Sequence, residues 1–149
     1  MLSAILSAVH LLALGIGLPS LFLRGRALRG PLDESGLRRL FLADTLWGVA
    51  AALWVVTGLV RAFGGLEKGS QFYLSSPLFL VKMGLLIAVL LLEIWPMVTF
   101  IRWRIARGRG QTPTKARLGG LYAVNQIQLG IVVVMVFVAS LMARGIGVS

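Results

Sequence analysis

The sequence predicts an all-α membrane protein, an up-down bundle of four transmembrane helices. Of its 149 residues, 58% are hydrophobic and only 13% are charged, and the mean hydropathy is +0.90. A soluble domain of this size needs a more polar surface than this chain can supply. Because the chain has no cysteine, disulfides and thiolate metal sites are excluded.

Four apolar stretches are each long enough to cross a bilayer, which takes about 20 residues in helical form. We place them at approximately 2–23, 37–63, 77–101 and 118–143, within a single domain over 1–149. Each must be helical, because lipid offers no partner to an unpaired backbone group. The first stretch has no basic leader and no cleavage site, so we expect a retained span. Short connections make neighbouring helices antiparallel.

The charge of the connections predicts the orientation of the bundle. The first connection, taken as 24–39, and the third, 102–117, are rich in Arg and Lys, whereas the second, 62–76, carries a single Lys. Basic loops stay in the cytoplasm, so we expect both termini on the periplasmic or outer side of a bacterial inner (plasma) membrane. The same rule accounts for the net charge of +10 without a nucleic-acid partner. The basic residues of the first connection are Arg24, Arg26, Arg29, Arg38 and Arg39.

Three basic side chains are predicted to form an outer layer inside the membrane. His10 lies roughly 12 Å below the outer end of the first span, at a rise of about 1.5 Å per residue. Lys82 lies roughly 8 Å below the outer end of the third span, and Arg61 closes the second span at the same side. Ionisable groups at such depths are costly, so each is a functional candidate.

Acidic and amide side chains are predicted to form a second, inner layer. Asp44 and Glu93 each lie roughly 10 Å from the inner ends of their spans. Lys82 and Glu93 share nearly the same helix face, at about 100° per residue. We expect Asp44 to be neutral or paired with Arg38 or Arg39, and Glu93 to be protonated or bonded to Asn125 or Lys82. The amides of this layer are Asn125, Gln126 and Gln128.

A single imidazole with basic groups near it is typical of a haem site. His10 would be the axial ligand, and Lys82 and Arg61 would pair with the propionates. A second ligand could be Lys82, a Met or a residue of a partner subunit. The alternative is non-enzymatic: ion or metal transport, or a structural or oligomeric subunit, using Asp44, Lys82 and Glu93 inside the membrane. In the plainest interpretation the polar groups only hold the helices together.

Three segments carry a resemblance over nearly the whole chain. LADTLWGVAAALWVVTGLVRAFGG, FYLSSPLFLVKMG and PMVTFIRWR resemble a family of small bacterial four-span membrane proteins of unknown function. This resemblance implies the four-span fold and no particular activity. More distantly, AVHLLALGIGLPSLF is similar to the first-helix motif of the membrane-embedded protoporphyrinogen oxidase family, with its His, its small residues and its Leu-Pro.

The more distant resemblance implies a bundle that holds a b-type haem near His10 and oxidises a porphyrinogen. Lys82 falls where that family has its third-helix Lys, and VNQIQ resembles its fourth-helix Asn-Glu-x-Pro, which makes Asn125 a site residue. The chain departs from the family's Arg, Glu and Pro at Ser20, Gln126 and Gln128. Copper-export membrane proteins share the same general pattern.

The sequence therefore favours a haem- or porphyrin-binding membrane protein with oxidoreductase-like chemistry through His10. Haem b is the expected cofactor, and the lipid bilayer is the expected partner, with a second copy of the chain or another membrane protein as a further one. The chain has no nucleotide motif and no nucleophile–base pair, so no reaction class follows from the residues. The expected binding residues are His10, Lys82, Arg61 and Asn125.

Overall fold

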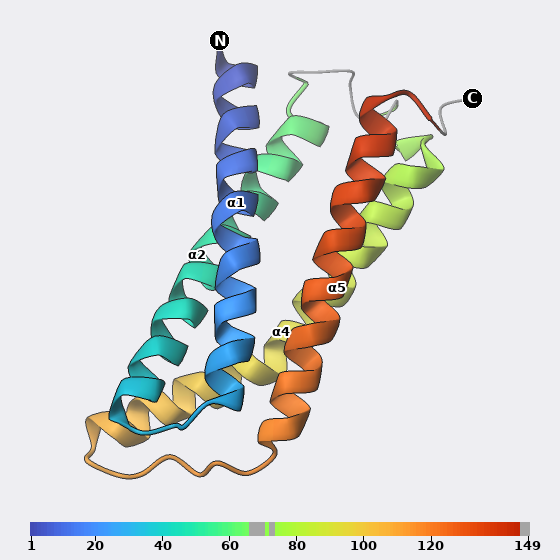
Figure 1. Ribbon diagram of the computed structural model, residues 1–149. Coiled ribbons are helices and arrows are strands. Elements are labelled where there is room, and N and C mark those ends of the chain that lie inside the picture. Colours follow the sequence, from blue (N-terminus) through green and yellow to red (C-terminus); the bar gives the residue numbers. More distant parts are fainter. Residues whose placement is uncertain (66–70, 72–73, 147–149) are drawn as a thin grey trace.

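The computed structural model describes residues 1–65, 71 and 74–146, which form four long helices and, within those ranges, no strand. The helices are α1 (Leu2–Arg29), α2 (Glu34–Phe63), α4 (Pro77–Gly108) and α5 (Leu118–Ala143) (Figure 1). The start of α1 and the end of α5 lie at one end of the bundle, which we call the terminal end. The connections 30–33 and 109–117 lie at the other, the basic end. The predicted up-down four-helix bundle is confirmed.

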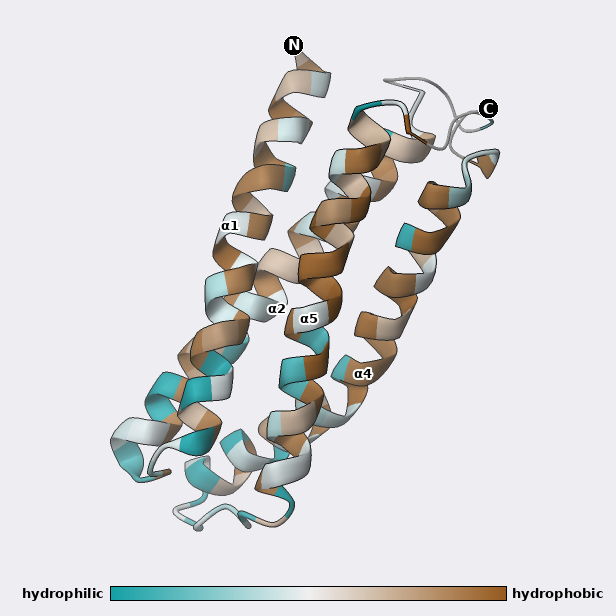
Figure 2. Ribbon diagram, turned by 45° about the vertical axis from the view of Figure 1, so that its right-hand side comes forward, coloured by the Kyte–Doolittle hydropathy of each residue, from teal (hydrophilic) through white to brown (hydrophobic). Residues whose placement is uncertain are grey.

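Each of the four helices is long and apolar enough to cross a membrane. Large apolar side chains lie on the outside of the bundle; Leu11, Leu12 and Phe137 are each about two-thirds exposed. Such a surface suits lipid rather than water. Polar residues gather toward the basic end, while the terminal half of the bundle is mostly apolar (Figure 2). The expected lipid bilayer environment follows from this distribution.

Side-chain caps set where two of the helices begin. The Asp33 carboxylate accepts a hydrogen bond of 2.7 Å from the Gly36 backbone N–H at the start of α2. This bond lowers the pKa of Asp33, because it stabilises the charged form. The Ser76 hydroxyl accepts from the Phe79 backbone N–H at the start of α4, where Pro77 occupies the first turn.

Three helices are longer than the predicted spans, and α2 begins at Glu34 instead of 37. α1 continues to Arg29 and α4 continues to Gly108, so the first and third connections are only 30–33 and 109–117. The prediction that 24–39 is a connection was therefore wrong, and Arg24 lies inside α1 with its side chain fully buried. Helix α1 continues because its inward face continues: Leu21, Arg24 and Leu28 are all buried at helical spacing.

The helices pack as two antiparallel pairs, α1 with α2 and α4 with α5, and α1 also packs against α5. At the basic end the second half of α4 reaches α2, where Arg107 pairs with Glu34 and Arg104 pairs with Asp44. Toward the terminal end the two pairs stand apart in the ribbon (Figure 1). The bundle is thus joined most completely at its basic half.

Two apolar clusters fill the interior and leave a polar level between them. The cluster nearer the basic end is Leu28, Leu32, Leu37, Leu40, Phe41, Phe100, Trp103 and Leu121. The second, nearer the terminal end, is Ala13, Leu21, Trp47, Trp54, Val89, Val132 and Met135. On every helix the residues between these clusters include a polar side chain that points inward. The polar level is therefore surrounded by apolar packing, where electrostatic interactions are stronger than in water.

Candidate functional site

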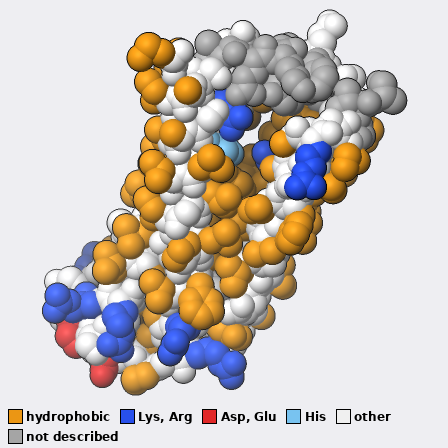
Figure 3. All heavy atoms as spheres, turned by 45° about the horizontal axis from the view of Figure 1, so that its top comes forward, with side chains coloured by type: hydrophobic (Ala, Val, Ile, Leu, Met, Phe, Trp, Pro, Cys, Tyr) orange, Lys and Arg blue, Asp and Glu red, His pale blue; other side chains and the backbone are white. Residues whose placement is uncertain are grey.

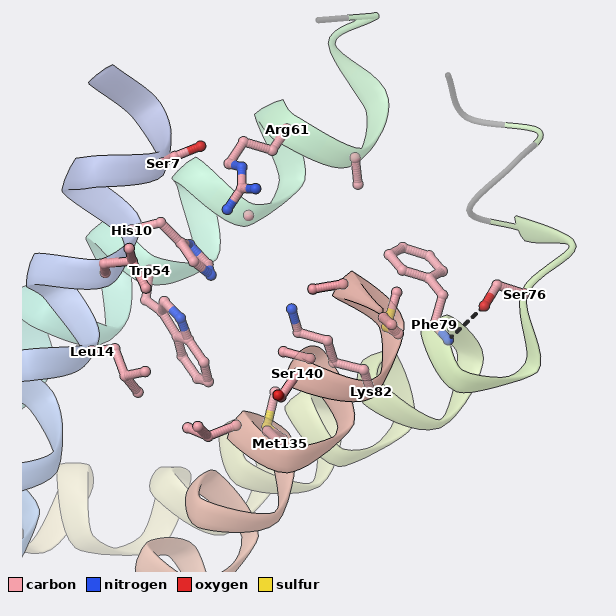
Figure 4. Close-up of a pocket in the computed structure, with 17 residues that line it drawn as sticks. Ser7, His10, Leu14, Trp54, Arg61, Ser76, Phe79, Lys82, Met135 and Ser140 are labelled. Atoms are coloured by element: carbon pink, nitrogen blue, oxygen red, sulfur yellow. Dashed lines mark hydrogen bonds between the residues drawn. The ribbon is translucent and has the colours of Figure 1, made fainter. Parts of the chain in front are cut away.

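A cavity of about 570 Å³ lies in the terminal half of the bundle, between the α1–α2 pair and the α4–α5 pair. We call it the His10 cavity. Figure 4 shows His10 from α1, Arg61 from α2 and Lys82 from α4 turned toward this common space. The predicted outer layer of three basic side chains is thus gathered at one site. The wall of the cavity also includes Ser7, Leu11, Leu14, Trp54, Gly58, Met135, Val136, Ala139, Ser140, Met142 and Ala143.

The His10 imidazole is held in a defined orientation. Its Nδ1 lies 2.9 Å from the Thr57 hydroxyl oxygen of α2. Thr57 donates its own proton to the Leu53 carbonyl at 2.6 Å, so its oxygen accepts from His10. In the neutral ring, Nδ1 then carries the proton and Nε2 carries the lone pair. The ring also packs at 5.7 Å from the Trp54 ring and against Gly58, where a Cβ would come within 3.2 Å.

Trp54 adds a buried donor to the same cavity. Trp54 is 7% exposed. Among the described residues, its Nε1 is the one buried side-chain nitrogen or oxygen that has no hydrogen-bond partner. A buried donor without an acceptor costs free energy. A ligand with an acceptor group would remove this cost.

A second polar group, which we call the Arg24 cluster, occupies the level between the two apolar clusters. Arg24 donates through Nε to Asn125 Oδ1 at 2.7 Å, and through its two terminal nitrogens to Asp44, Glu93 and Gln128 at 2.7 to 3.0 Å. All of the donors of the guanidinium are used. The side chain is 0% exposed and its partners come from the other three helices, so this one residue ties the whole bundle together.

The remaining bonds of the cluster satisfy the partners of Arg24. Asp44 also accepts from Arg104 at 2.8 Å, and Gln128 donates to Glu93 at 2.6 Å. Asn125 donates to the Leu21 carbonyl at 3.0 Å. Two guanidinium cations thus face two carboxylates, and the charges of the cluster balance.

The cluster corrects several expectations about the inner layer. Asp44 pairs with Arg24 and Arg104, not with Arg38 or Arg39. Those two arginines precede Asp44 on its own helix and are exposed, whereas the partners come from neighbouring helices. The expected hydrogen bond from Lys82 or Asn125 to Glu93 was also wrong, because Arg24 and Gln128 donate to its carboxylate instead.

The four expected binding residues are not all at one site. His10, Arg61 and Lys82 line the cavity, but Asn125 lies in the Arg24 cluster and is absent from the cavity wall. Gln126 lies beside α1, where its Nε2 would come 2.9 Å from a Cβ at Gly25. Among the described residues, no three His, Cys, Asp or Glu side chains form a group that could hold a metal ion.

Sequence reasoning missed Arg24, although a signal for it was present. The inward face of α1 runs through Ala13, Gly17 and Ser20 at spacings of three and four residues. The next positions on that face are Leu21 and Arg24. Extending the helix beyond the last apolar residue would have placed Arg24 on the buried face rather than in a loop.

The comparisons with known proteins agree with this architecture. The family described as "Predicted membrane protein (DUF2214)" matches residues 2–147, nearly the whole chain. No curated protein and no solved structure matches the chain. From the extent of the family match, together with the four apolar helices, we conclude that the chain belongs to the DUF2214 family of predicted membrane proteins.

Proposed function

We propose that this protein binds a tetrapyrrole, haem b, in the His10 cavity. The observation that carries the proposal is the convergence of His10, Arg61 and Lys82 from three helices on one cavity with apolar walls. His10 would be the axial ligand of the iron. Arg61 and Lys82 would pair with the propionate carboxylates, which are anions that arginine and lysine bind well.

The cavity meets the requirements of such a ligand. Its volume of about 570 Å³ lies within the range of small-molecule sites, roughly 300 to 1,000 Å³. A metal-binding histidine usually donates its other ring N–H to a neighbouring acceptor, and Thr57 is such an acceptor for His10. The indole N–H of Trp54 offers one more donor to an anionic group. Together these features support an oriented imidazole with anion-binding groups around it.

A haem held in this way would supply one-electron redox chemistry. The residues of this chain would orient the imidazole, neutralise the carboxylates and keep water from the apolar part of the ring. An oxidoreductase role requires that the bound haem change oxidation state, which a spectrum of the reduced and oxidised protein measures directly.

The proposed setting is the inner membrane of a bacterium with both termini on the periplasmic or outer side. The basic end carries the connections 30–33 and 109–117, with Arg26 and Arg29 just before the first and Arg109, Lys115 and Arg117 in the second. Positive charge collects on the cytoplasmic side of a membrane protein. In this orientation the His10 cavity lies in the outer half of the membrane. Cysteine introduced near either terminus and labelled with an impermeant maleimide on intact cells would report its side, because the chain has no other thiol.

The second candidate function is a structural membrane subunit, and the Arg24 cluster favours it over transport. Asp44 and Glu93 are already held by charge-assisted bonds from Arg24. A path for ions would need these carboxylates to exchange partners during each passage. Lys82 belongs to the other site, at the His10 cavity. Flux measured in liposomes with Asp44→Asn and Glu93→Gln tests transport, and unchanged flux in both variants favours the structural role.

The deciding experiment for haem binding is the absorption spectrum of the detergent-purified protein with added haem. We expect a Soret band that shifts on reduction in the native protein and in Leu12→Ala, which changes an exposed side chain of the same helix outside the cavity wall. We expect its loss in His10→Ala and weaker binding in Lys82→Met. The absence of a Soret band in the native protein would refute the proposal. A Soret band in His10→Ala that is identical to that of the native protein would refute the axial role of His10.

A further inference from the structure

We infer that the His10 cavity is open sideways to the lipid between α1 and α5, and that its ligand is an acidic amphiphile that enters from the bilayer. The inference deepens the proposed function, because it names the class of ligand and its route. Its support comes from the packing of α1 against α5, the size of the side chains along their seam and the polar groups inside the cavity.

Helices α1 and α5 are joined toward the basic end. Their hydrogen bonds run from Arg24 to Asn125 and from Asn125 to the Leu21 carbonyl. There the Asn125 side chain lies directly against α1, since a Cβ on Gly25 would come 2.7 Å from its amide nitrogen. From this junction the two helices continue toward the terminal end on opposite sides of the cavity (Figure 4).

The seam between α1 and α5 beside the cavity carries small or lipid-exposed side chains. On α5 the cavity wall includes the small residues Ala139, Ser140 and Ala143 besides Val136 and Met142, and on α1 it includes Ser7 and Leu11. Leu11 is 66% exposed. Figure 3, in which the terminal end is tilted toward the viewer, shows the histidine in a hollow between α1 and the opposite helices. Of the described α1 and α5 residues that line the cavity, Met135 is the one that is buried.

The seam lies within the membrane-spanning part of both helices. His10 is eight residues from the start of α1, roughly 12 Å along the helix axis. The surface around the opening is apolar, so a molecule that passes through it must be soluble in the bilayer. Inside the cavity it meets Arg61 and Lys82, two cations that favour an acidic group. An apolar body with a carboxylate satisfies both requirements.

Trp54 provides a direct measurement of this access. Brominated acyl chains quench tryptophan fluorescence on contact, and dibrominated stearic acid is an acidic amphiphile of the class inferred. In vesicles that contain it, we expect quenching in a Trp95→Phe background, which removes the lipid-exposed indole of α4, and we expect most of that quenching to be lost when Trp54→Phe is added. The methyl ester of the same acid, which lacks the negative charge, is expected to quench Trp54 less. Equal quenching with and without Trp54→Phe in that background would overturn the inference.

The route is tested by blocking the seam chemically. Ala139→Cys places the only thiol of the chain at the seam, and a bulky methanethiosulfonate can be attached to it and removed again with a reductant. Modification is expected to abolish most of the Trp54 quenching, and reduction to restore it. The matched control is Phe137→Cys, which is exposed to lipid and lies about 200° around α5 from Ala139. Quenching that survives modification at Ala139 would overturn the proposed route.

The haem spectrum and the quenching experiment fail independently. A protein without a Soret band whose Trp54 is quenched through the open seam would refute the tetrapyrrole and support the lateral route. A protein with a Soret band whose Trp54 quenching is unaffected by modification at Ala139 would support the tetrapyrrole and refute the route.

Discussion

Replacing Arg24 with methionine is expected to destabilise the bundle by about 3 kcal/mol. Arg24 makes five hydrogen bonds, to Asn125, Asp44, Glu93 twice and Gln128. Side-chain hydrogen bonds inside membrane proteins average about 0.6 kcal/mol each, which gives about 3 kcal/mol for the set. Breaking a buried ion pair costs about 3 to 5 kcal/mol, and the two estimates meet at the lower value.

Removing the arginine leaves Asp44 and Glu93 with different hydrogen-bond partners. Asp44 keeps its bond to Arg104, whereas Glu93 keeps only the amide of Gln128. The cost should therefore arise mainly from Glu93, whose side chain is 19% exposed. The double variant Arg24→Met with Glu93→Gln removes the unpaired charge, so it is expected to be more stable than the sum of the two single changes implies.

The assay is equilibrium unfolding in mixed detergent micelles, followed by circular dichroism. Arg26→Met is the matched control, because Arg26 lies on the same helix but is exposed, and it is expected to change the free energy of unfolding by less than about 0.5 kcal/mol. An equally small change for Arg24→Met would refute the role assigned to the cluster. So would strict additivity of Arg24→Met and Glu93→Gln.

Two further predictions concern the junction of α1 with α5 and the start of α2. Gly25→Ala is expected to lower the free energy of unfolding by about 1 to 3 kcal/mol. Its Cβ would lie 2.7 Å from the Asn125 amide nitrogen, and that amide is held in place by hydrogen bonds at both its oxygen and its nitrogen. Gly15→Ala, with nothing within 4 Å, is expected to be neutral or slightly stabilising in the same unfolding assay. The cap at Asp33 predicts a pH effect: because the folded-state pKa is lowered, its contribution is present above the ordinary Asp pKa and is lost as the pH falls through the lowered value. Asp33→Asn should reduce this acid dependence, and an unchanged pH profile of unfolding would contradict the capping role of the carboxylate toward Gly36.

Much of the architecture was predictable because it depends on properties that run along the chain. Hydropathy located the four spans, and the start of α4 at Pro77 and the bounds of α5 agree with the prediction. Depth along a helix follows from residue number, so the layer of His10, Arg61 and Lys82 was also predictable. Helix periodicity further predicted that Lys82 and Glu93 point to the same side of α4.

Hydrogen-bond partners were less accessible, because they depend on how each helix is rotated and which helices are neighbours. Asp44 was assigned to arginines on its own helix, but it bonds to Arg104, sixty residues away. Asn125 was grouped with His10 by resemblance, but it lies against α1 in the Arg24 cluster. Neither separation follows from hydropathy or from depth.

By itself, the sequence determined that this protein is a four-helix membrane bundle with two levels of buried polar groups. Only the tertiary structure decided that one level is the closed, charge-balanced Arg24 cluster and that the other is the His10 cavity. The physical reason is that burying a charge in a membrane is tolerable only where partners from several helices converge on it. That convergence is a property of packing in three dimensions, and it is complete around Arg24, whereas the cavity around His10 still holds the unsatisfied donor of Trp54.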